Sequence, residues 1–166
     1  MKDNVLKITY GGVLAAVVML ATYVIVIPIP GNTGYFNLGD GVIFGIATIL
    51  GPFAAISAAI GSGLADLVAG YSIYIPATVL IKGCMGYLAG FIMLKKPDIR
   101  WYYLIILFFV CELIMVSGYF FYEWLLNGFG NAAAAIPANL LQGIAAIALG
   151  MAIVPLARRV KTLIRI

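Results

Sequence analysis

Short polar breaks divide the sequence into apolar runs of about twenty residues, and this pattern limits what the chain can fold into. Hydrophobic residues make up 64% of the chain and charged residues only 10%, whereas a soluble domain has roughly 25% charged residues. About twenty apolar residues are what one helical crossing of a bilayer requires. The sequence therefore predicts an all-α integral membrane protein, with residues 1–166 forming a single domain.

The number of crossings depends on one break in the chain. The first apolar run covers residues 8–29, and later runs are separated by polar gaps at residues 70–72, 95–100 and 127–131. Between residues 41 and 69 the chain is apolar throughout, but Gly51 and Pro52 divide it into pieces of roughly ten and eighteen residues. The count is five or six helical segments, depending on whether the chain reverses at this break.

The distribution of Lys and Arg favours six segments, because cytoplasmic loops near membrane spans are enriched in these residues. With a reversal at Gly51, all the basic clusters outside the spans fall on one side: Lys2 and Lys7; Lys95, Lys96 and Arg100; Arg158, Arg159, Lys161 and Arg165. We therefore predict a six-helix transmembrane bundle with cytoplasmic N- and C-termini. Its second segment is short, and we expect neighbouring helices to cover it.

Several function classes have little support. The basic residues flank apolar runs and form no continuous patch, so the net charge of +4 does not indicate nucleic-acid binding. The chain has no His and no recognisable metal-ligand cluster or nucleophile–base pair, so neither an enzyme nor a metal or cofactor site is expected. Cys84 and Cys111 lie in apolar runs and are expected to be free thiols.

Charged side chains inside membrane spans are costly, and each is therefore a candidate for function. In the predicted topology almost all such polar residues fall in the outer half of the bundle. The spacing of Glu112, Tyr119 and Glu123 places them on one face of a helix, and Asn139 and Gln142 share a face of the next. We expect an outward-facing pocket with aromatic walls drawn from Tyr71, Tyr74, Tyr119, Tyr122 and Trp124.

Structural roles compete with ligand binding at several of these positions. Asp66 and Lys82 could neutralise each other across a helical hairpin, and Asp40 could be the N-cap of the helix that follows it. Glu123 could be a solvated carboxylate at the membrane interface. Asn139 and Gln142 could join neighbouring helices by hydrogen bonds.

Small residues in the first and third segments predict close helix packing. Gly11, Gly12, Ala15 and Ala16 form two overlapping small-x-x-x-small pairs, a pattern that lets another helix approach closely. A second group of small residues, between residues 54 and 63, is expected to pack inside the bundle.

Six short stretches together resemble the substrate-binding S components of energy-coupling factor (ECF) vitamin transporters. They are residues 34–41 (GYFNLGDG), 50–52 (LGP), 61–66 (GSGLAD), 81–90 (IKGCMGYLAG), 118–124 (GYFFYEW) and 136–143 (IPANLLQG). The resemblance implies a six-helix subunit in the bacterial cell membrane that binds a water-soluble vitamin or precursor. It also implies two kinds of partner: a transmembrane coupling protein of the EcfT type and two cytoplasmic ATPases. The chain contains no G-x-x-x-x-G-K-[ST] motif for nucleotide binding, which agrees with ATP hydrolysis by the partner ATPases.

The resemblance also implies roles for particular residues. Gly11, Gly12, Ala15 and Ala16 match the face that docks the coupling protein, and the loop with Tyr35, Asn37 and Asp40 matches the segment that covers the ligand. The expected substrate-binding residues are Asn37, Asp40, Lys82, Glu112, Tyr119, Glu123, Asn139 and Gln142. The pattern is most similar to branches assigned to pyridoxine or hydroxymethylpyrimidine. The alternative is a stand-alone, ion-coupled secondary transporter of a small polar metabolite, using Asp66 or Glu112.

Overall fold

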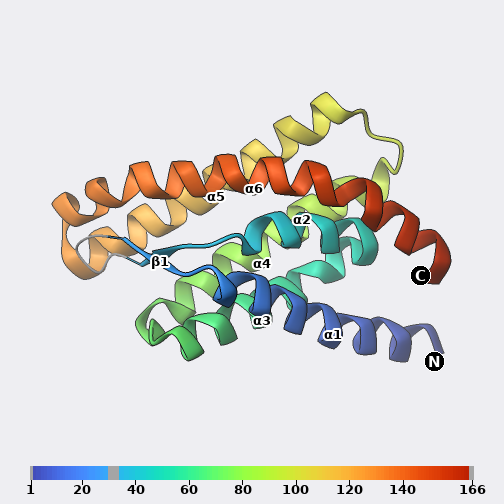
Figure 1. The fold of residues 1–166 in the computed structure, drawn as a ribbon, viewed down its shortest axis with the longest axis horizontal. Helices are drawn as coiled ribbons and strands as arrows, with labels where there is room; N and C mark the ends of the chain where they lie inside the picture. The colour runs from blue at the N-terminus through green and yellow to red at the C-terminus, as the bar shows by residue number, and fades with distance from the viewer. Residues whose placement is uncertain (1, 30–33, 165–166) are drawn as a thin grey trace.

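The computed structural model describes residues 2–29 and 34–164, and its described part is an almost entirely helical bundle (Figure 1). Its six α-helices are α1 (Lys2–Val24), α2 (Gly39–Leu50), α3 (Ala54–Ala69), α4 (Ile75–Lys95), α5 (Trp101–Asn127) and α6 (Phe129–Ile164). Two short antiparallel strands, β1 (Ile27–Pro28) and β2 (Tyr35–Phe36), lie between α1 and α2. Five helical stretches are apolar and long enough to cross a membrane, which confirms the predicted class of protein.

The break at Gly51 reverses the chain. A short 3-10 turn, η1 (Gly51–Phe53), joins α2 to α3. In Figure 1, α3 runs in the direction opposite to that of α2. The helix α2 has only 12 residues, almost all of them buried, and it packs mainly against α6 and α4. The short second segment is therefore covered by its neighbours, as expected. The count of six membrane segments stays a prediction, because α2, η1 and α3 together make one of the five apolar stretches.

Close approach at η1 requires a glycine on α4. A Cβ atom at Gly90 would overlap the carbonyl group of Gly51 and come within 2.9 Å of the backbone nitrogen of Pro52. Because these neighbours are backbone atoms, no side-chain movement can relieve the overlap. We expect Gly90→Val to cost about 1–3 kcal/mol of folding free energy, the usual range for overpacking. Chemical denaturation in detergent measures this cost, with Gly12→Val, where the added atoms meet open space, as the control; equal stability of the two variants contradicts the expectation.

Two helix boundaries differ from the sequence prediction. The first helix ends at Val24 rather than at Ile29, because Ile27 and Pro28 pair with Phe36 and Tyr35 in the hairpin. The predicted gap at residues 127–131 is too wide, since α6 already begins at Phe129. Gly128 alone makes this turn, with a φ of 85° that favours glycine.

The basic segments gather at one end of the bundle. Both termini and the connection between α4 and α5 lie at the same end in Figure 1, and the hairpin and the α5–α6 turn lie at the opposite end. A hydrogen bond of 3.3 Å from the Arg158 guanidinium to the carbonyl oxygen of Ile99 joins the end of α6 to the α4–α5 connection. The bundle thus has one basic end and, at the hairpin, one end without Lys or Arg among its described residues.

The interior contains an apolar core and small-residue contacts. Phe44 of α2 stacks on Phe108 of α5, with ring centroids 4.0 Å apart, and both side chains are fully buried. The small residues of α3 are largely buried where this helix packs against α1 and α4, so the packing role predicted for residues 54–63 is confirmed. Both cysteines are free thiols, as expected.

Candidate ligand-binding site

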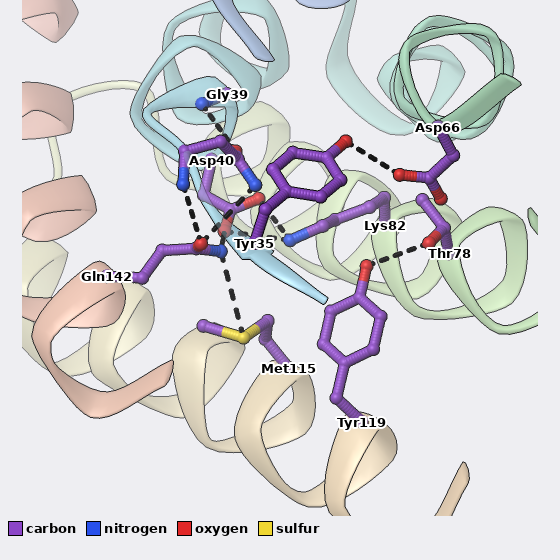
Figure 2. A network of polar contacts seen from close by, with 10 residues as sticks. Tyr35, Gly39, Asp40, Asp66, Thr78, Lys82, Met115, Tyr119 and Gln142 are labelled. Carbon is purple, nitrogen blue, oxygen red and sulfur yellow. Dashed lines mark hydrogen bonds and ion pairs between the residues drawn. The ribbon is translucent and has the colours of Figure 1, made fainter. Parts of the chain in front are cut away.

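A buried ion pair joins α2 to α4 at the centre of the candidate site (Figure 2). The Nζ atom of Lys82 lies 2.6 Å and 2.8 Å from the two carboxylate oxygens of Asp40, and the two residues are 2% and 0% exposed. Lys82 therefore pairs with Asp40, and not with Asp66, the pairing that the sequence had left open. The N-cap interpretation of Asp40 is wrong, because α2 begins at Gly39 and the Asp40 side chain bonds across the bundle instead of to its own helix.

Gln142 of α6 connects this ion pair to the segment before α2. Its side-chain nitrogen donates to Asp40 at 2.9 Å, and its oxygen accepts hydrogen bonds from the backbone and side-chain nitrogens of Asn37, at 2.9 Å and 3.3 Å. The Asn37 side chain in turn accepts a hydrogen bond of 2.9 Å from the backbone N–H of Gly39. Buried networks whose members are all hydrogen-bonded stabilise one arrangement, so these contacts fix α2, α4 and α6 relative to one another.

Tyr35 reaches from the hairpin into the bundle and donates a hydrogen bond of 2.6 Å to the Oδ1 atom of Asp66 on α3 (Figure 2). Burial, with the nearby Asp66 carboxylate as a further cause, raises the pKa of the Tyr35 phenol above its ordinary value. The phenol therefore stays protonated at physiological pH and serves as a hydrogen-bond donor.

Tyr119 of α5 completes the opposite side of the site. Its hydroxyl lies 2.9 Å from that of Thr78 on α4, and its ring lies 5.3 Å from the Lys82 ammonium, within cation–π range. Lys82 is therefore held between a carboxylate and an aromatic face.

These side chains surround one small cavity of about 30 Å³. A cavity of this size holds about a water molecule or two, so the side chains nearly close the site. Residues from α1, from the hairpin and the segment after it, from α3, from α4 and the turn before it, and from α5 and α6 line its walls: Thr22, Gly34, Tyr35, Asn37, Ser62, Asp66, Tyr74, Thr78, Lys82, Tyr119, Asn139 and Gln142.

Of the eight predicted substrate-binding residues, five line this cavity: Asn37, Lys82, Tyr119, Asn139 and Gln142. Asp40 contacts the lining through Lys82 and Gln142 but does not itself face the cavity. Glu112 and Glu123 are buried outside the lining. The assignment of all eight to substrate binding stays a prediction.

The two glutamates have different surroundings. Glu123 is 2% exposed and accepts hydrogen bonds from Tyr74 and, at 2.7 Å, from Asn127, so the interpretation of a solvated interfacial carboxylate is wrong. Glu112 is 4% exposed, packs against Gly143, and has no hydrogen bond from any described residue to either carboxyl oxygen. Glu123 thus supports the cavity wall through Tyr74, whereas the role of Glu112 is not explained by its contacts.

Sequence reasoning missed several lining residues: Thr22, Ser62 and Thr78 are lone hydroxyl residues within apolar spans. The same rule that selected charged residues in spans would have found them if it had been extended to hydroxyls. Ser62 was hidden among small residues that predict packing, whereas Tyr35 was named only as part of the loop expected to cover the ligand.

The small residues of α1 face two directions. Gly11 and Ala15 are buried where α1 meets α3: the carbonyl oxygen of Gly11 accepts a hydrogen bond of 2.9 Å from Ser57. Gly12 and Ala16 are exposed on the outer face of α1, and nothing lies within 4 Å of a Cβ atom placed at Gly12. The docking role of α1 stays a prediction, and of its four small residues Gly12 and Ala16 are the two that are exposed.

Comparisons with known proteins agree with this architecture. Residues 2–159 match the family described as "ECF-type riboflavin transporter, S component". The chain is 33% identical over 160 residues to the thiamine precursor transporter HmpT of Lactococcus lactis subsp. cremoris, covering 94% of this chain and 90% of the relative. It is also 31% identical over 134 residues to an uncharacterised protein of Pyrococcus woesei, covering 80% of this chain and 88% of that protein.

Proposed function

The chain belongs to the S components of ECF-type transporters, and from this premise we propose that it captures a small single-ring vitamin or vitamin precursor for import. As a member of this family it is a multi-pass protein of the cell membrane and a transporter subunit, not an enzyme. In the proposed mechanism, the loaded subunit delivers its substrate through a transmembrane coupling protein that two cytoplasmic ATPases energise.

The observation that carries this proposal is the convergence of buried polar side chains from separate helices on a single cavity near the hairpin. Desolvated polar groups are costly, and their collection around one cavity is typical of a small-molecule site. The ring of Tyr35 lies among the labelled side chains of the site (Figure 2) and lines the cavity, and we infer that outward movement of this phenol provides room for one ring. Hydroxymethylpyrimidine or pyridoxine fits this better than the fused three-ring system of riboflavin. The HmpT relative, named for a thiamine precursor, favours the pyrimidine.

The basic end of the bundle is the cytoplasmic end in this proposal, following the enrichment of Lys and Arg in cytoplasmic loops. With α2 and α3 as a hairpin of helices, the chain has six segments and both termini lie in the cytoplasm. The hairpin β1–β2 and the cavity beneath it then face the outside, where the substrate arrives.

Direct ligand identification tests the proposed function. We expect mass spectrometry of the protein purified in mild detergent to find a retained pyrimidine or pyridine, and calorimetry to give saturable binding of the same compound. A folded protein that binds no member of a panel of B vitamins and their precursors contradicts the proposal. Uptake into liposomes by the chain alone, without coupling protein and ATPases, would instead support the ion-coupled alternative.

We predict that Asn139→Ala weakens ligand binding about 3- to 10-fold, the effect of losing one hydrogen bond. Asn139 is 7% exposed and lines the cavity. The matched control is Asn131→Ala, which removes the same amide from an exposed position on the same helix. Calorimetric titration of both variants measures the effect, and equal affinities of Asn139→Ala and the wild type remove Asn139 from the site.

A further inference from the structure

Three buried polar atoms in the cavity wall have no hydrogen-bond partner among the described residues. They are the hydroxyl oxygens of Thr22 on α1 and Ser62 on α3, and the Oδ2 atom of Asp66 on α3. The three residues are 3%, 1% and 3% exposed. Unpaired polar groups at such depth are rare in folded proteins and cost free energy, so each requires an explanation.

The positions of these three unpaired atoms give one explanation for all of them. Ser62 and Asp66 are one helical turn apart on α3, so both project to the same face, and α1 packs directly against α3. Thr78 also faces the Asp66 carboxyl (Figure 2), but its hydroxyl is within hydrogen-bonding distance of Tyr119. Ser62 and the Asp66 carboxyl thus lie together on α3, and Thr22 of α1 lines the same cavity close to Gly39. We name Thr22, Ser62 and Asp66 the Asp66 subsite.

The charges around the cavity define the ligand chemistry. Lys82 is the only Lys or Arg between Lys7 and Lys95, and Asp40 neutralises it at 2.6 Å. Among the described residues Asp66 forms no ion pair, and its Oδ1 atom accepts the hydrogen bond of the Tyr35 phenol. A carboxylate in a cavity wall that also carries two unpaired hydroxyls attracts N–H donors and repels anions.

We propose that the Asp66 subsite binds a ring amino group of the ligand, and that the Tyr35 phenol occupies this subsite until the ligand displaces it. This inference rests on the proposed function and specifies its substrate class: a neutral or cationic heteroaromatic ring with an exocyclic amino group. The two N–H bonds of an amino group match two acceptors, the Asp66 carboxylate and a flanking hydroxyl. The Tyr35 O–H···Asp66 bond of 2.6 Å is the contact that the ligand N–H replaces.

A pair of ligands that differ only at the amino group tests the substrate class. We expect the wild-type protein to bind an aminopyrimidine about 10- to 100-fold more tightly than the same pyrimidine with methyl in place of amino, as for a hydrogen bond to a charged group. In Asp66→Asn this preference is expected to shrink about 10-fold. Equal binding of both compounds, or binding of neither by a protein that binds another single-ring vitamin, overturns only this inference. A folded protein that binds neither compound nor any other B vitamin or precursor contradicts the proposed function itself.

Substitutions of two serines on α3 distinguish a ligand-binding role from a structural role. Ser62→Ala removes a hydroxyl without a described partner, so we expect unchanged thermal stability and about 3- to 10-fold weaker aminopyrimidine binding. Ser57 is equally buried, but its hydroxyl donates to Gly11. Ser57→Ala is therefore expected to lower thermal stability and leave binding unchanged. Unchanged binding in Ser62→Ala overturns the role of its hydroxyl in the subsite.

The displacement of Tyr35 has its own test. Tyr35→Phe leaves Asp66 without its donor in the ligand-free protein, so ligand binding no longer has to break this hydrogen bond. We expect Tyr35→Phe to bind the aminopyrimidine about 3- to 10-fold more tightly than the wild type. Weaker binding would show that the phenol contacts the bound ligand, which overturns the proposed displacement. Both proteins are compared by calorimetry in the same detergent.

Discussion

Lys82→Met is expected to destabilise the protein by about 3–5 kcal/mol, the usual cost of leaving one member of a buried ion pair without its partner. The substitution keeps most of the side-chain volume but removes the ammonium that lies 2.6 Å and 2.8 Å from the Asp40 carboxylate oxygens. Asp40 is fully buried, and Gln142 then remains its only described donor. Chemical denaturation in detergent, followed by tryptophan fluorescence, measures the loss.

A double-mutant comparison identifies the partner of Lys82. Asp40→Asn in the Lys82→Met background removes the unpaired charge, so we expect it to restore much of the lost stability. Asp66→Asn in the same background is not expected to do so, because Asp66 is bonded to Tyr35 instead. Recovery with Asp66→Asn but not with Asp40→Asn would show that the ion pair is wrongly assigned. Lys95→Met, at an exposed position, is the control and should leave stability nearly unchanged.

Gly12→Trp is expected to abolish assembly with the coupling protein, and with it ATP-driven uptake, while leaving ligand affinity as in the wild type. Gly12 and Ala16 are one turn apart on the exposed face of α1, and open space surrounds the Cβ position of Gly12. A tryptophan there is tolerated by the isolated subunit but blocks the close approach of a second helix. Co-purification with the coupling protein and ATPases, followed by transport in liposomes, measures the loss.

A matched variant shows whether bulk alone causes the effect. Gly130 also has open space around its Cβ position, but it lies at the start of α6, next to the turn at Gly128. Gly130→Trp is therefore expected to assemble and transport normally. Gly11→Trp is unsuitable as a control, since Phe53 occupies the space beside Gly11 and the subunit itself would be disturbed. Normal co-purification of Gly12→Trp would remove the docking role of α1.

The candidate docking residues of α1 show what residue spacing can predict and what it cannot. Four small residues, Gly11, Gly12, Ala15 and Ala16, are equivalent in the sequence, because all belong to small-x-x-x-small pairs. In the bundle, one pair packs internally against α3 and the other faces outward. A periodicity identifies a smooth helix surface, but the rotation of that helix about its axis depends on what its neighbours bury.

Some site residues were found from the sequence, and others only from the structure. Lys82, Asn139 and Gln142, which were selected as polar residues in apolar spans, line the cavity, because a polar side chain in such a span is turned away from lipid. Their role in substrate binding stays a prediction. The acid that pairs with Lys82 was not predicted: Asp66 is nearer in the sequence, but Asp40, 42 residues away, is its partner. The unpaired hydroxyls of Thr22 and Ser62 were also missed, because only the packed structure reveals which hydroxyls lack partners.

By itself, the sequence determined that this chain is a multi-pass membrane protein, where most of its helices begin and end, and that its basic residues other than Lys82 lie at or beyond the ends of the apolar stretches. The physical reason is local: in hydrocarbon each span must satisfy its own backbone hydrogen bonds, so its apolar length is visible residue by residue. Only the tertiary structure decided that Asp40 pairs with Lys82, that Tyr35 bonds Asp66, and which face of α1 is open. Such contacts depend on the depth and rotation at which separate helices pack, and no short stretch of sequence contains that information.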